Sequence, residues 1–455
     1  ISHQVASPGG GGAYATDGAA AVPATPSATS VQPVTTSNLP SAIASGGLAN
    51  VLNIEAPTAP PVVRLLDPLF GSLRGGAGGG GGGRSLFGTD SSGFPPNFCV
   101  GVGTNIQGFR DSATREPLRE DAIFRLYSMT KPIVSVAALS LMEEGRLSLD
   151  EPVSKYIPEF KSMSVGTETF DPKTGTQSFQ TVPAKRQITV QDLLRHTSGL
   201  TYGPPLSTRT HIHRMYKEAG IWSQDWLLAD FAKALAKMPL VAEPGTTWEY
   251  SHSTDILGRV VEVAAGKTLD LVVQERVLNP LGMTDTHFSL PSDKHARIAQ
   301  PQPDPYTGVT PDLLDFTKPQ TFFAGGHGLA GTAGDYMRFV QMLVNGGSLE
   351  GARVLGPRTV EFASSNHLHP GIDRGTGYLP GPGYGFGLGF AVRTDRGMST
   401  WNGSTGDYYW GGAGGTAFWV DPKEQLVVVF MTTEPTRRMQ YRMALRSLVY
   451  QSIIE

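Results

Sequence analysis

The amino-acid sequence predicts an α/β protein in which a sheet is flanked by helices and a helical insertion interrupts the chain. Three observations favour this class: a long apolar helix early in the globular part, several helical patterns in its middle, and strand-like runs followed by a last helix at its end. A chain of 455 residues with 39% hydrophobic residues is long enough to bury a sizeable core.

The first 93 residues differ from the rest in composition. They are rich in Gly, Ala, Ser, Thr and Pro, include the glycine tract 78–83, and show no sustained periodicity. Such a composition buries too little apolar area to offset its ordering entropy. We therefore expect a low-complexity arm or linker over residues 1–93 and a globular domain over residues 94–455. The tract formally contains G-x-G-x-x-G, but no strand leads into it, so phosphate binding is not predicted.

The elements of the globular domain follow from hydrophobic periodicity. Residues 131–144 are apolar on nearly every side and are followed by Gly145, which predicts a buried central helix. Two strand-like runs at 417–420 and 425–432 are joined through Asp421-Pro422-Lys423. The helical insertion spans roughly residues 150–330. Further helices are expected at residues 190–195, 226–237, 254–265, 335–343 and 437–453.

Charge and cysteine content limit which classes of partner and which compartments fit the sequence. The formal net charge is −3 and no long Lys/Arg block is present, so nucleic acids and anionic membranes are poor candidates. No apolar run approaches the roughly 18 to 20 residues that span a bilayer, so a soluble chain without a transmembrane segment is expected. Cys99 is the only cysteine, which excludes an internal disulfide. The compartment stays open between the cytoplasm and an organelle lumen such as that of a mitochondrion; the start at Ile1 fits either removal of a targeting segment or a chosen chain boundary.

Ser128 and Lys131 form a Ser-x-x-Lys pattern at the entrance of the predicted central helix. A spacing of three places Lys131 one turn beyond Ser128 on the same side, and Pro132 fits the first helical turn. A serine hydroxyl is inert near neutral pH unless a base takes its proton, and a buried lysine is one such base. The helix amino terminus disfavours a protonated lysine and stabilises negative charge beside the serine. Ser-x-x-Lys alone, however, is common by chance.

The residues around Ser128 and Lys131 indicate which protein family the pattern resembles. From about residue 100 to the carboxyl end, the chain resembles the class C β-lactamase-like (penicillin-binding-protein-like) serine hydrolases, above all their carboxylesterase and acyltransferase branch. The resemblance implies a β-lactamase/transpeptidase-like fold, with an antiparallel sheet between helices. The stretches that carry it are 124–132 (FRLYSMTKP), 141–145 (LMEEG), 193–200 (LLRHTSGL), 244–251 (PGTTWEYS), 280–286 (PLGMTDT) and 325–338 (GGHGLAGTAGDYMR).

The same resemblance implies the rest of the site. Tyr250 matches the family's third catalytic residue, which shares a proton with the lysine and acts as base toward Ser128 and then as acid toward the leaving group. Trp410-Gly411-Gly412 matches the family's Lys-Thr-Gly element on the edge strand of the sheet. The oxyanion hole would then combine the Ser128 N–H with an N–H near Gly412 or Ala413.

Three departures from the family pattern bear on substrate and fold. β-Lactamases of this class carry Asn two positions after the tyrosine, where this chain has His252, and a lysine where it has Trp410. Because those groups hold the amide and carboxylate of a β-lactam, their loss implies neutral acyl esters as substrates. The first strand of the sheet either lies diverged near residues 51–66 or is missing, and a reduced sheet would permit a retired enzyme.

The histidines suggest a substrate contact rather than a metal site. The pairs His211/His213 and His367/His369 lack a carboxylate or a third histidine at helical spacing, so exposed loop positions and no metal are expected. No G-x-S-x-G motif is present, which removes the nucleophile elbow of the α/β-hydrolases. The candidate substrate-binding side chains are Trp410, His252 and His327.

Three functions compete on this basis. The first is a cofactor-free serine carboxylesterase or acyltransferase, in which Ser128 takes the acyl group of a small-molecule ester and passes it to water or an alcohol. The second is D-aminopeptidase or weak β-lactamase chemistry at the same site. The third is a catalytically idle subunit or scaffold, with the amino-terminal arm contacting a protein partner or another copy of the chain. The sequence does not identify the natural acyl donor or acceptor.

Overall fold

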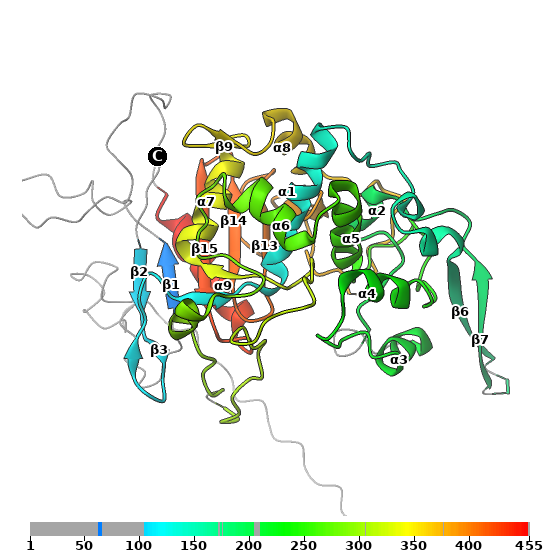
Figure 1. The fold of residues 1–455 in the computed structure, drawn as a ribbon, viewed down its shortest axis with the longest axis horizontal. Helices are drawn as coiled ribbons and strands as arrows, with labels where there is room; N and C mark the ends of the chain where they lie inside the picture. The colour runs from blue at the N-terminus through cyan, green and yellow to red at the C-terminus, as the bar shows by residue number, and fades with distance from the viewer. Residues whose placement is uncertain are drawn as a thin grey trace, which may run out of the picture. The chain divides into compact units, whose positions relative to one another are not determined.

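The computed structural model describes residues 62–65, 104–171, 173–174, 176–203, 210–304, 306–375 and 377–453, so the glycine tract 78–83 and Cys99 lie outside the described residues. Its centre is a seven-stranded antiparallel sheet, which together with the helices around it confirms the predicted fold class (Figure 1). In spatial order the strands are β11 (Tyr384–Phe386), β12 (Ala391–Arg393), β13 (Tyr408–Gly411), β14 (Ala417–Asp421), β15 (Leu426–Thr432), β1 (Val62–Leu65) and β2 (Thr104–Gln107).

The first strand of the sheet is present. β1 lies within the segment 51–66, one of the two alternatives that the sequence left open, and it pairs on both sides. Val62 is opposite Thr432 of β15 and opposite Gln107 of β2. The alternative of a sheet without its first strand is therefore wrong. The strand escaped the periodicity argument because it has only four residues and lies among the Gly- and Pro-rich stretches of the first hundred.

The two faces of β14 and β15 pack against different helices, because successive side chains of a strand alternate in direction. One face joins the main core together with α1 (Thr130–Glu143) and α7 (Ala333–Val344); it carries Phe418, Val420, Val429 and Met431. The other face packs against Leu445 and Val449 of α9 (Arg438–Gln451); it carries Trp419, Val428 and Phe430. Each fully buried side chain of this kind contributes about 1.5 to 3 kcal/mol, so both helices are anchored by the sheet.

The central helix α1 is buried from Thr130 to Leu141, as predicted for residues 131–144. Pro132 occupies its first turn, where a missing N–H costs no helical hydrogen bond, and Gly145 follows its end with a φ of +68°. The other predicted helices are also observed within two residues of their expected ends. They are α2 (Val190–Leu194), α4 (Leu228–Leu235), α5 (Ser253–Ala265), α7 and α9.

The insertion at residues 150–330 is not purely helical. Besides α2, α4 and α5 it contains α3 (His211–Glu218), α6 (Leu269–Val273) and a π-turn at Gln274–Leu278. It also carries the long hairpin of β6 (Ser164–Asp171) and β7 (Thr176–Pro183), which extends away from the helices in Figure 1. The hairpin was not predicted from the sequence, although Pro and Gly between its strands are a turn signal.

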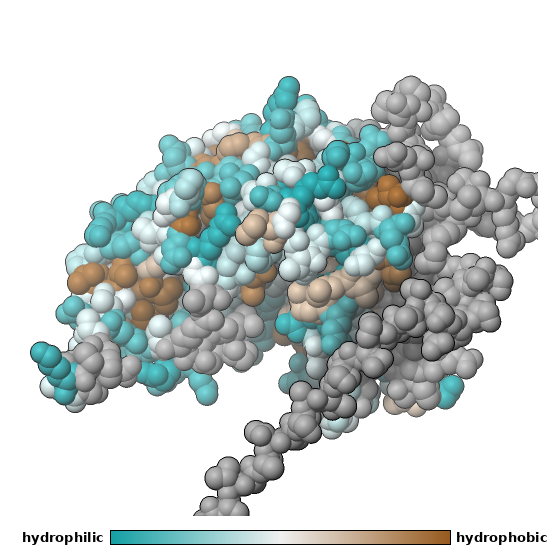
Figure 2. Space-filling model, turned by 180° about the vertical axis from the view of Figure 1, so that it is seen from behind, coloured by the Kyte–Doolittle hydropathy of each residue, from teal (hydrophilic) through white to brown (hydrophobic). Residues whose placement is uncertain are grey.

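Short elements complete the described chain. β3 (Phe109–Asp111) pairs with β4 (Glu116–Pro117), β5 (Ile123–Arg125) with β8 (Ala330–Thr332), and β9 (Ser348–Leu349) with β10 (Ala352–Arg353). α8 (Pro357–Ala363) follows β10. Figure 2 shows one face of the molecule, on which hydrophobic side chains form small groups separated by hydrophilic ones. Within the described part of the chain, no helix is long and apolar enough to cross a membrane.

Candidate active site

Ser128 lies in the 3-10 turn Tyr127–Met129, which connects β5 to α1. This connection is tied to the insertion, because the Leu126 N–H donates to Leu329 O at 2.9 Å. Tyr127 has a φ of +45°, a left-handed conformation that bulky residues rarely adopt, and its hydroxyl accepts the Leu314 N–H at 3.0 Å. Tertiary contacts therefore hold a strained entry to α1 that presents Ser128 at the amino-terminal end of the helix.

Lys131 is 1% exposed and points at the nucleophile rather than at solvent. Its Nζ lies 2.7 Å from Gly326 O, 2.9 Å from Tyr202 Oη and 3.3 Å from Ser128 Oγ. An ammonium group has three hydrogens to donate, so each of them has an acceptor. The surroundings thus fit a charged lysine whose burial is compensated by hydrogen bonds.

Tyr250 comes from the loop before α5, and its hydroxyl lies 2.6 Å from Ser128 Oγ. Trp410 Nε1 donates to the same hydroxyl at 3.4 Å, and Lys131 Nζ lies 4.6 Å from the centre of the Tyr250 ring. The structure therefore brings together Ser128, Lys131, Tyr250 and Trp410, four residues that are up to 282 positions apart (410 − 128) in the chain.

Tyr202 belongs to the site although the sequence did not single it out. It follows the 193–200 motif by two positions, is buried, and its hydroxyl accepts from Lys131. Burial, together with the neighbouring Tyr250 and Asp255, raises the pKa of Tyr202 well above its usual value. Tyr202 is therefore a neutral phenol at physiological pH. Its distance from the Ser-x-x-Lys pattern in the chain left no spacing signal that could have identified it.

The glycine-rich turn after β13 packs against the entry to Ser128. A side chain at Gly412 would lie 2.3 Å from Leu126 O, so only glycine permits this approach. The Gly412 N–H donates to Thr416 O at 2.8 Å, whereas the N–H groups of Ser128 and Ala413 have no hydrogen-bond partner among the described residues. Of the two positions considered for the second oxyanion donor, Ala413 is the one with an available N–H.

The strand that carries Trp410 and Gly411 is not an edge strand, which corrects the expectation taken from the family. β11 and β12 lie beyond β13 in the sheet. Pairing between β12 and β13 ends at Ala391 opposite Tyr409, so the last two residues of β13 extend past β12. The part of β13 that contacts Tyr250 therefore has no paired residue of β12 beside it.

His252 and His327, the histidines expected at the cleft, are both buried. His252 Nδ1 lies 2.7 Å from Asp255 Oδ2, and Asp255 Oδ1 accepts the Gly326 N–H at 2.7 Å. Burial alone would raise the pKa of Asp255, but the His252 hydrogen bond and the positive charge around the carboxylate, that of Lys131 included, outweigh it and hold the pKa at about 2. Burial lowers the pKa of His327 to about 4, so its ring is neutral at neutral pH.

His196 and His213 have structural contacts. His196 has a φ of +58°, its carbonyl accepts the Glu249 N–H at 2.9 Å, and burial with the Lys131 charge lowers its pKa well below the usual value. His213 is buried in α3 and closes a capping box with Thr210, which corrects the expectation of an exposed loop. In the described ranges, no three His, Cys, Asp or Glu side chains are grouped to hold a metal ion.

Comparisons with known proteins bear on the family and the fold. A family model described as Beta-lactamase matches residues 82–451. Protein Rv1367c of Mycobacterium tuberculosis is 37% identical over 338 residues, covering 72% of this chain and 81% of that protein. Esterase EstB of Burkholderia gladioli is 33% identical over 367 residues, covering 76% and 86%. The solved structure of EstCE1, described as a hydrolase with promiscuous acyltransferase activity, matches with a TM-score of 0.64 at 27% identity over 77% of this chain and 90% of the other. These matches confirm the fold expected from the motifs.

Proposed function

We propose that this chain, which belongs to the β-lactamase family, is an esterase or acyltransferase that forms an acyl-enzyme at Ser128. The observation that carries the proposal is the 2.6 Å contact between Tyr250 Oη and Ser128 Oγ, with Lys131 Nζ 3.3 Å from the same oxygen. The relatives EstB, named an esterase, and EstCE1, named a hydrolase with acyltransferase activity, support this class of reaction. A scaffold would gain nothing from a buried lysine at a serine hydroxyl, since burying a charge costs free energy.

In the proposed acylation, the Tyr250 phenolate accepts the Ser128 hydroxyl proton while Oγ bonds to the ester carbonyl carbon. Tyr250 is nearer to Ser128 than Lys131 is, and the three Lys131 hydrogens already have acceptors, which makes the phenol oxygen the better-placed base. The Lys131 charge near the Tyr250 ring and the Trp410 Nε1 donor stabilise negative charge on the phenolate.

The carbonyl oxygen becomes negatively charged in this step and needs donors fixed in advance. The N–H groups of Ser128 and Ala413 fit this role, because both are without a partner among the described residues and the turn that carries Ala413 packs on the entry to Ser128. When the tetrahedral intermediate collapses, the bond from carbon to the alcohol oxygen breaks and Tyr250 returns its proton to the leaving alkoxide. Water or another alcohol then attacks the acyl-enzyme by the same steps in reverse, and Ser128 regains its proton.

The side chains around the nucleophile favour neutral esters over β-lactams. Trp410 replaces a lysine that would bind a carboxylate, and its indole contacts Tyr250 instead. His252 replaces an asparagine, and its ring is turned to the buried Asp255. Neither residue offers a charged or amide contact for a β-lactam. The side chains at these two positions therefore do not support a β-lactamase or D-aminopeptidase role.

The decisive experiment is labelling with a fluorophosphonate probe, followed by mass spectrometry of the adduct. We expect a single adduct on Ser128, hydrolysis of a short-chain nitrophenyl ester, and a loss of roughly 10⁴-fold or more in Ser128→Ala. Ser292→Ala, which removes an exposed serine of the insertion, is the matched control and should keep both labelling and turnover.

Two results would overturn the proposal. A folded wild-type protein that stays unlabelled at Ser128 and hydrolyses no ester would support the idle-subunit alternative. Faster turnover of nitrocefin than of the nitrophenyl ester would support a β-lactamase instead.

A further inference from the structure

Six aromatic side chains form a closed circuit of ring contacts beside Ser128; we call it the aromatic circuit. Tyr202 connects it to the candidate nucleophile, because its hydroxyl accepts from Lys131 and its ring centre lies 5.1 Å from that of Tyr250. Neighbouring ring centres in the circuit lie 4.4 to 6.3 Å apart, and Trp222 also contacts His252 across it at 5.2 Å. In order around it, the members are Tyr202, Trp222, His327, Phe322, Phe231 and His252.

His252 contributes an unpaired nitrogen to this circuit. Its Nδ1 faces Asp255, which is a carboxylate and can only accept, so Nδ1 carries a hydrogen. The remaining ring nitrogen is Nε2. It is buried and has no partner among the described residues.

His327 contributes two further unpaired nitrogens. Its side chain is buried, and neither Nδ1 nor Nε2 has a partner among the described residues. A neutral ring offers one donor and one acceptor there. The two contacts of His327, 6.3 Å to Trp222 and 6.1 Å to Phe322, are the longest in the circuit, whereas the others measure 4.4 to 5.2 Å. The ring with the most unpaired nitrogens therefore has the most distant ring neighbours of the circuit.

Three unpaired buried nitrogens within one circuit of rings call for a hydrogen-bonding partner. Buried polar atoms of native proteins nearly always have such a partner. The neighbouring aromatic rings give a carbon chain apolar contacts but cannot pair with the histidine nitrogens. A ligand group that is part apolar and part hydrogen-bonding fits both features.

The position of the circuit assigns it to the acyl group of the ester. Tyr250 is the proposed proton donor to the leaving alcohol, and Trp410 lies against it from β13. Tyr202 also contacts Tyr250, but no ring contact joins Tyr202 to Trp410 in the described structure. The circuit thus approaches Ser128 from the Lys131 side, away from the tryptophan next to the leaving group.

We propose that the aromatic circuit is the acyl subsite and that His327, with His252, binds a hydroxyl or oxo group on the acyl chain. The inference rests on the proposed function and names its substrate class: esters of short hydroxy- or oxo-acids rather than of plain alkanoic acids. A hydroxyl group can accept a hydrogen bond and can also donate one to the unprotonated nitrogen of the neutral His327 ring, whereas an oxo group can only accept. Hydroxy-acyl esters are therefore the better substrates of the two.

The test compares kcat/KM for nitrophenyl 3-hydroxybutyrate, 4-oxopentanoate, butyrate and pentanoate. The wild-type protein should prefer the hydroxy ester over butyrate by about tenfold or more, because a site built to hydrogen-bond a substrate group rejects the analogue that lacks it. His327→Phe should abolish the preference, because kcat/KM for the hydroxy ester should fall by more than kcat/KM for butyrate. His327→Asn, which keeps a donor and an acceptor, should retain part of it.

Matched controls separate this inference from the proposed function and from misfolding. His369→Phe makes the same replacement at an exposed histidine and should change none of the ratios. His327→Phe should melt at the same or a higher temperature, because it removes two unpaired buried nitrogens. Ester turnover without a preference, or a preference that survives His327→Phe, would overturn this inference alone. No turnover of any ester would overturn the proposed function.

Discussion

The two faces of β13 differ in how the polar groups near them are hydrogen-bonded. On one face Trp410 contacts Tyr250 and Phe386, next to the candidate nucleophile. On the other face Tyr409 contacts Trp401, and the Arg446 guanidinium lies 5.9 Å from its ring centre. Adjacent residues of one strand thus reach two different environments, because their side chains alternate in direction.

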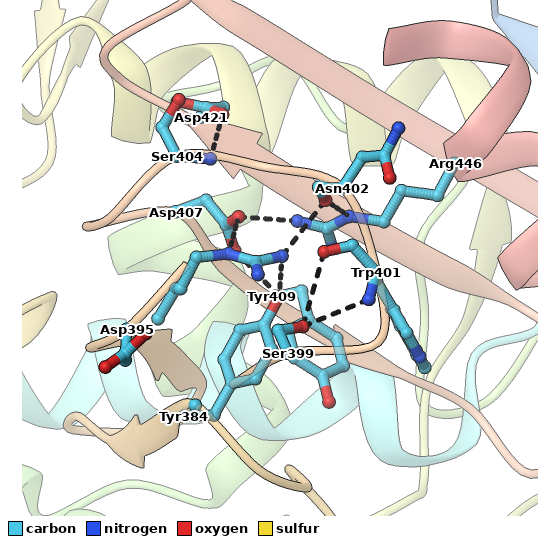
Figure 3. A network of polar contacts seen from close by, with 12 residues as sticks. Tyr384, Asp395, Ser399, Trp401, Asn402, Ser404, Asp407, Tyr409, Asp421 and Arg446 are labelled. Carbon is cyan, nitrogen blue, oxygen red and sulfur yellow. Dashed lines mark hydrogen bonds and ion pairs between the residues drawn. The ribbon is translucent and has the colours of Figure 1, made fainter. Parts of the chain in front are cut away.

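The face toward α9 is a paired network, which Figure 3 shows. Asp407 Oδ2 accepts from Arg393 Nε and from Arg446 Nη2, both at 2.6 Å, and its other oxygen accepts from Tyr384 at 3.2 Å. The Asn402 carbonyl also accepts from both arginines. In this described cluster, Arg393 Nη1 is the one buried side-chain nitrogen or oxygen of the two arginines and Asp407 without a partner.

The face toward Ser128 has unpaired groups at the candidate site. The N–H groups of Ser128 and Ala413, His252 Nε2 and both ring nitrogens of His327 have no partner among the described residues. Unpaired buried groups cost stability, about 1 to 3 kcal/mol each, whereas paired ones hold the fold together. The difference separates a face organised for stability from a face organised for a ligand, and it predicts that equivalent substitutions on the two faces have different consequences.

The largest contrast is expected from the same Tyr→Phe change on both faces. Tyr250→Phe removes the hydroxyl 2.6 Å from Ser128 Oγ and should lower kcat for ester hydrolysis by roughly 10²–10⁴-fold, the range for a lost general base. Tyr409→Phe removes a hydroxyl that donates to Pro380 O at 3.0 Å, which should cost about 1 kcal/mol of stability. Steady-state kinetics and urea unfolding measure both. If kcat fell equally in the two variants, the two faces of β13 would not differ in their effect on ester hydrolysis.

The network itself should give the largest loss of stability. Asp407→Asn removes the charge shared by two buried arginines and should lower the free energy of unfolding by about 3 kcal/mol, as expected when one partner of a buried ion pair is lost. Urea unfolding at pH 7 tests this value. The variant that remains folded should keep kcat within about threefold of wild type. A fall in kcat as large as that of Tyr250→Phe would contradict the comparison.

The sequence pointed to more residues on the Ser128 side of this comparison than on the α9 side. Ser128, Lys131 and Tyr250 lie in local motifs, so their identity could be read without knowing the fold. Arg393, Asp407 and Arg446 come from β12, the start of β13 and α9, and no local pattern connects them. Tyr202 and Asp255 were missed for the same reason, since their role depends on Lys131 and Gly326, which lie far away in the chain. The seven-stranded order depended on β1, which is too short to show periodicity.

A smaller effect should appear in the pH dependence of stability on the Ser128 face. Asp255 has a pKa of about 2 against an ordinary value of 3.8. Its ionised form is therefore favoured by folding, and it contributes about 2 kcal/mol that is complete above pH 5 and is lost as the pH falls from about 4 to 2. The folded protein favours the neutral form of His327, because burial lowers its pKa from 6.5 to about 4. The unfolded chain binds this proton first, so the free energy of unfolding falls as the pH drops from 6.5 to 4.

The variant Asp255→Asn separates these two pH ranges. The difference in unfolding free energy between wild type and Asp255→Asn should shrink below pH 4, and His327→Phe should flatten only the range from pH 6.5 to 4. Lys131, His252 and Tyr202, which also surround Asp255, stay unchanged in both variants. A wild-type difference from Asp255→Asn that is constant between pH 7 and 2.5 would contradict the assignment.

The smallest effect is expected where the two faces are joined. Arg442 of α9 is half-buried and donates through Nη2 to Gly412 O and Thr416 O, both at 2.6 Å. Burial lowers its pKa to about 10, so it remains charged at neutral pH. It therefore fixes, from the α9 side, the turn that presents the Ala413 N–H.

Arg442→Met keeps the length of the side chain and removes the donors. We expect kcat to fall about tenfold with little change in KM, because a displaced oxyanion donor acts on the transition state rather than on substrate binding. Arg442→Lys can still donate to both carbonyls and should recover part of kcat. If Arg442→Met lowered only the melting temperature, α9 would stabilise β13 without positioning the turn. A selective loss of kcat would instead show that the paired face fixes the geometry on which the unpaired face depends.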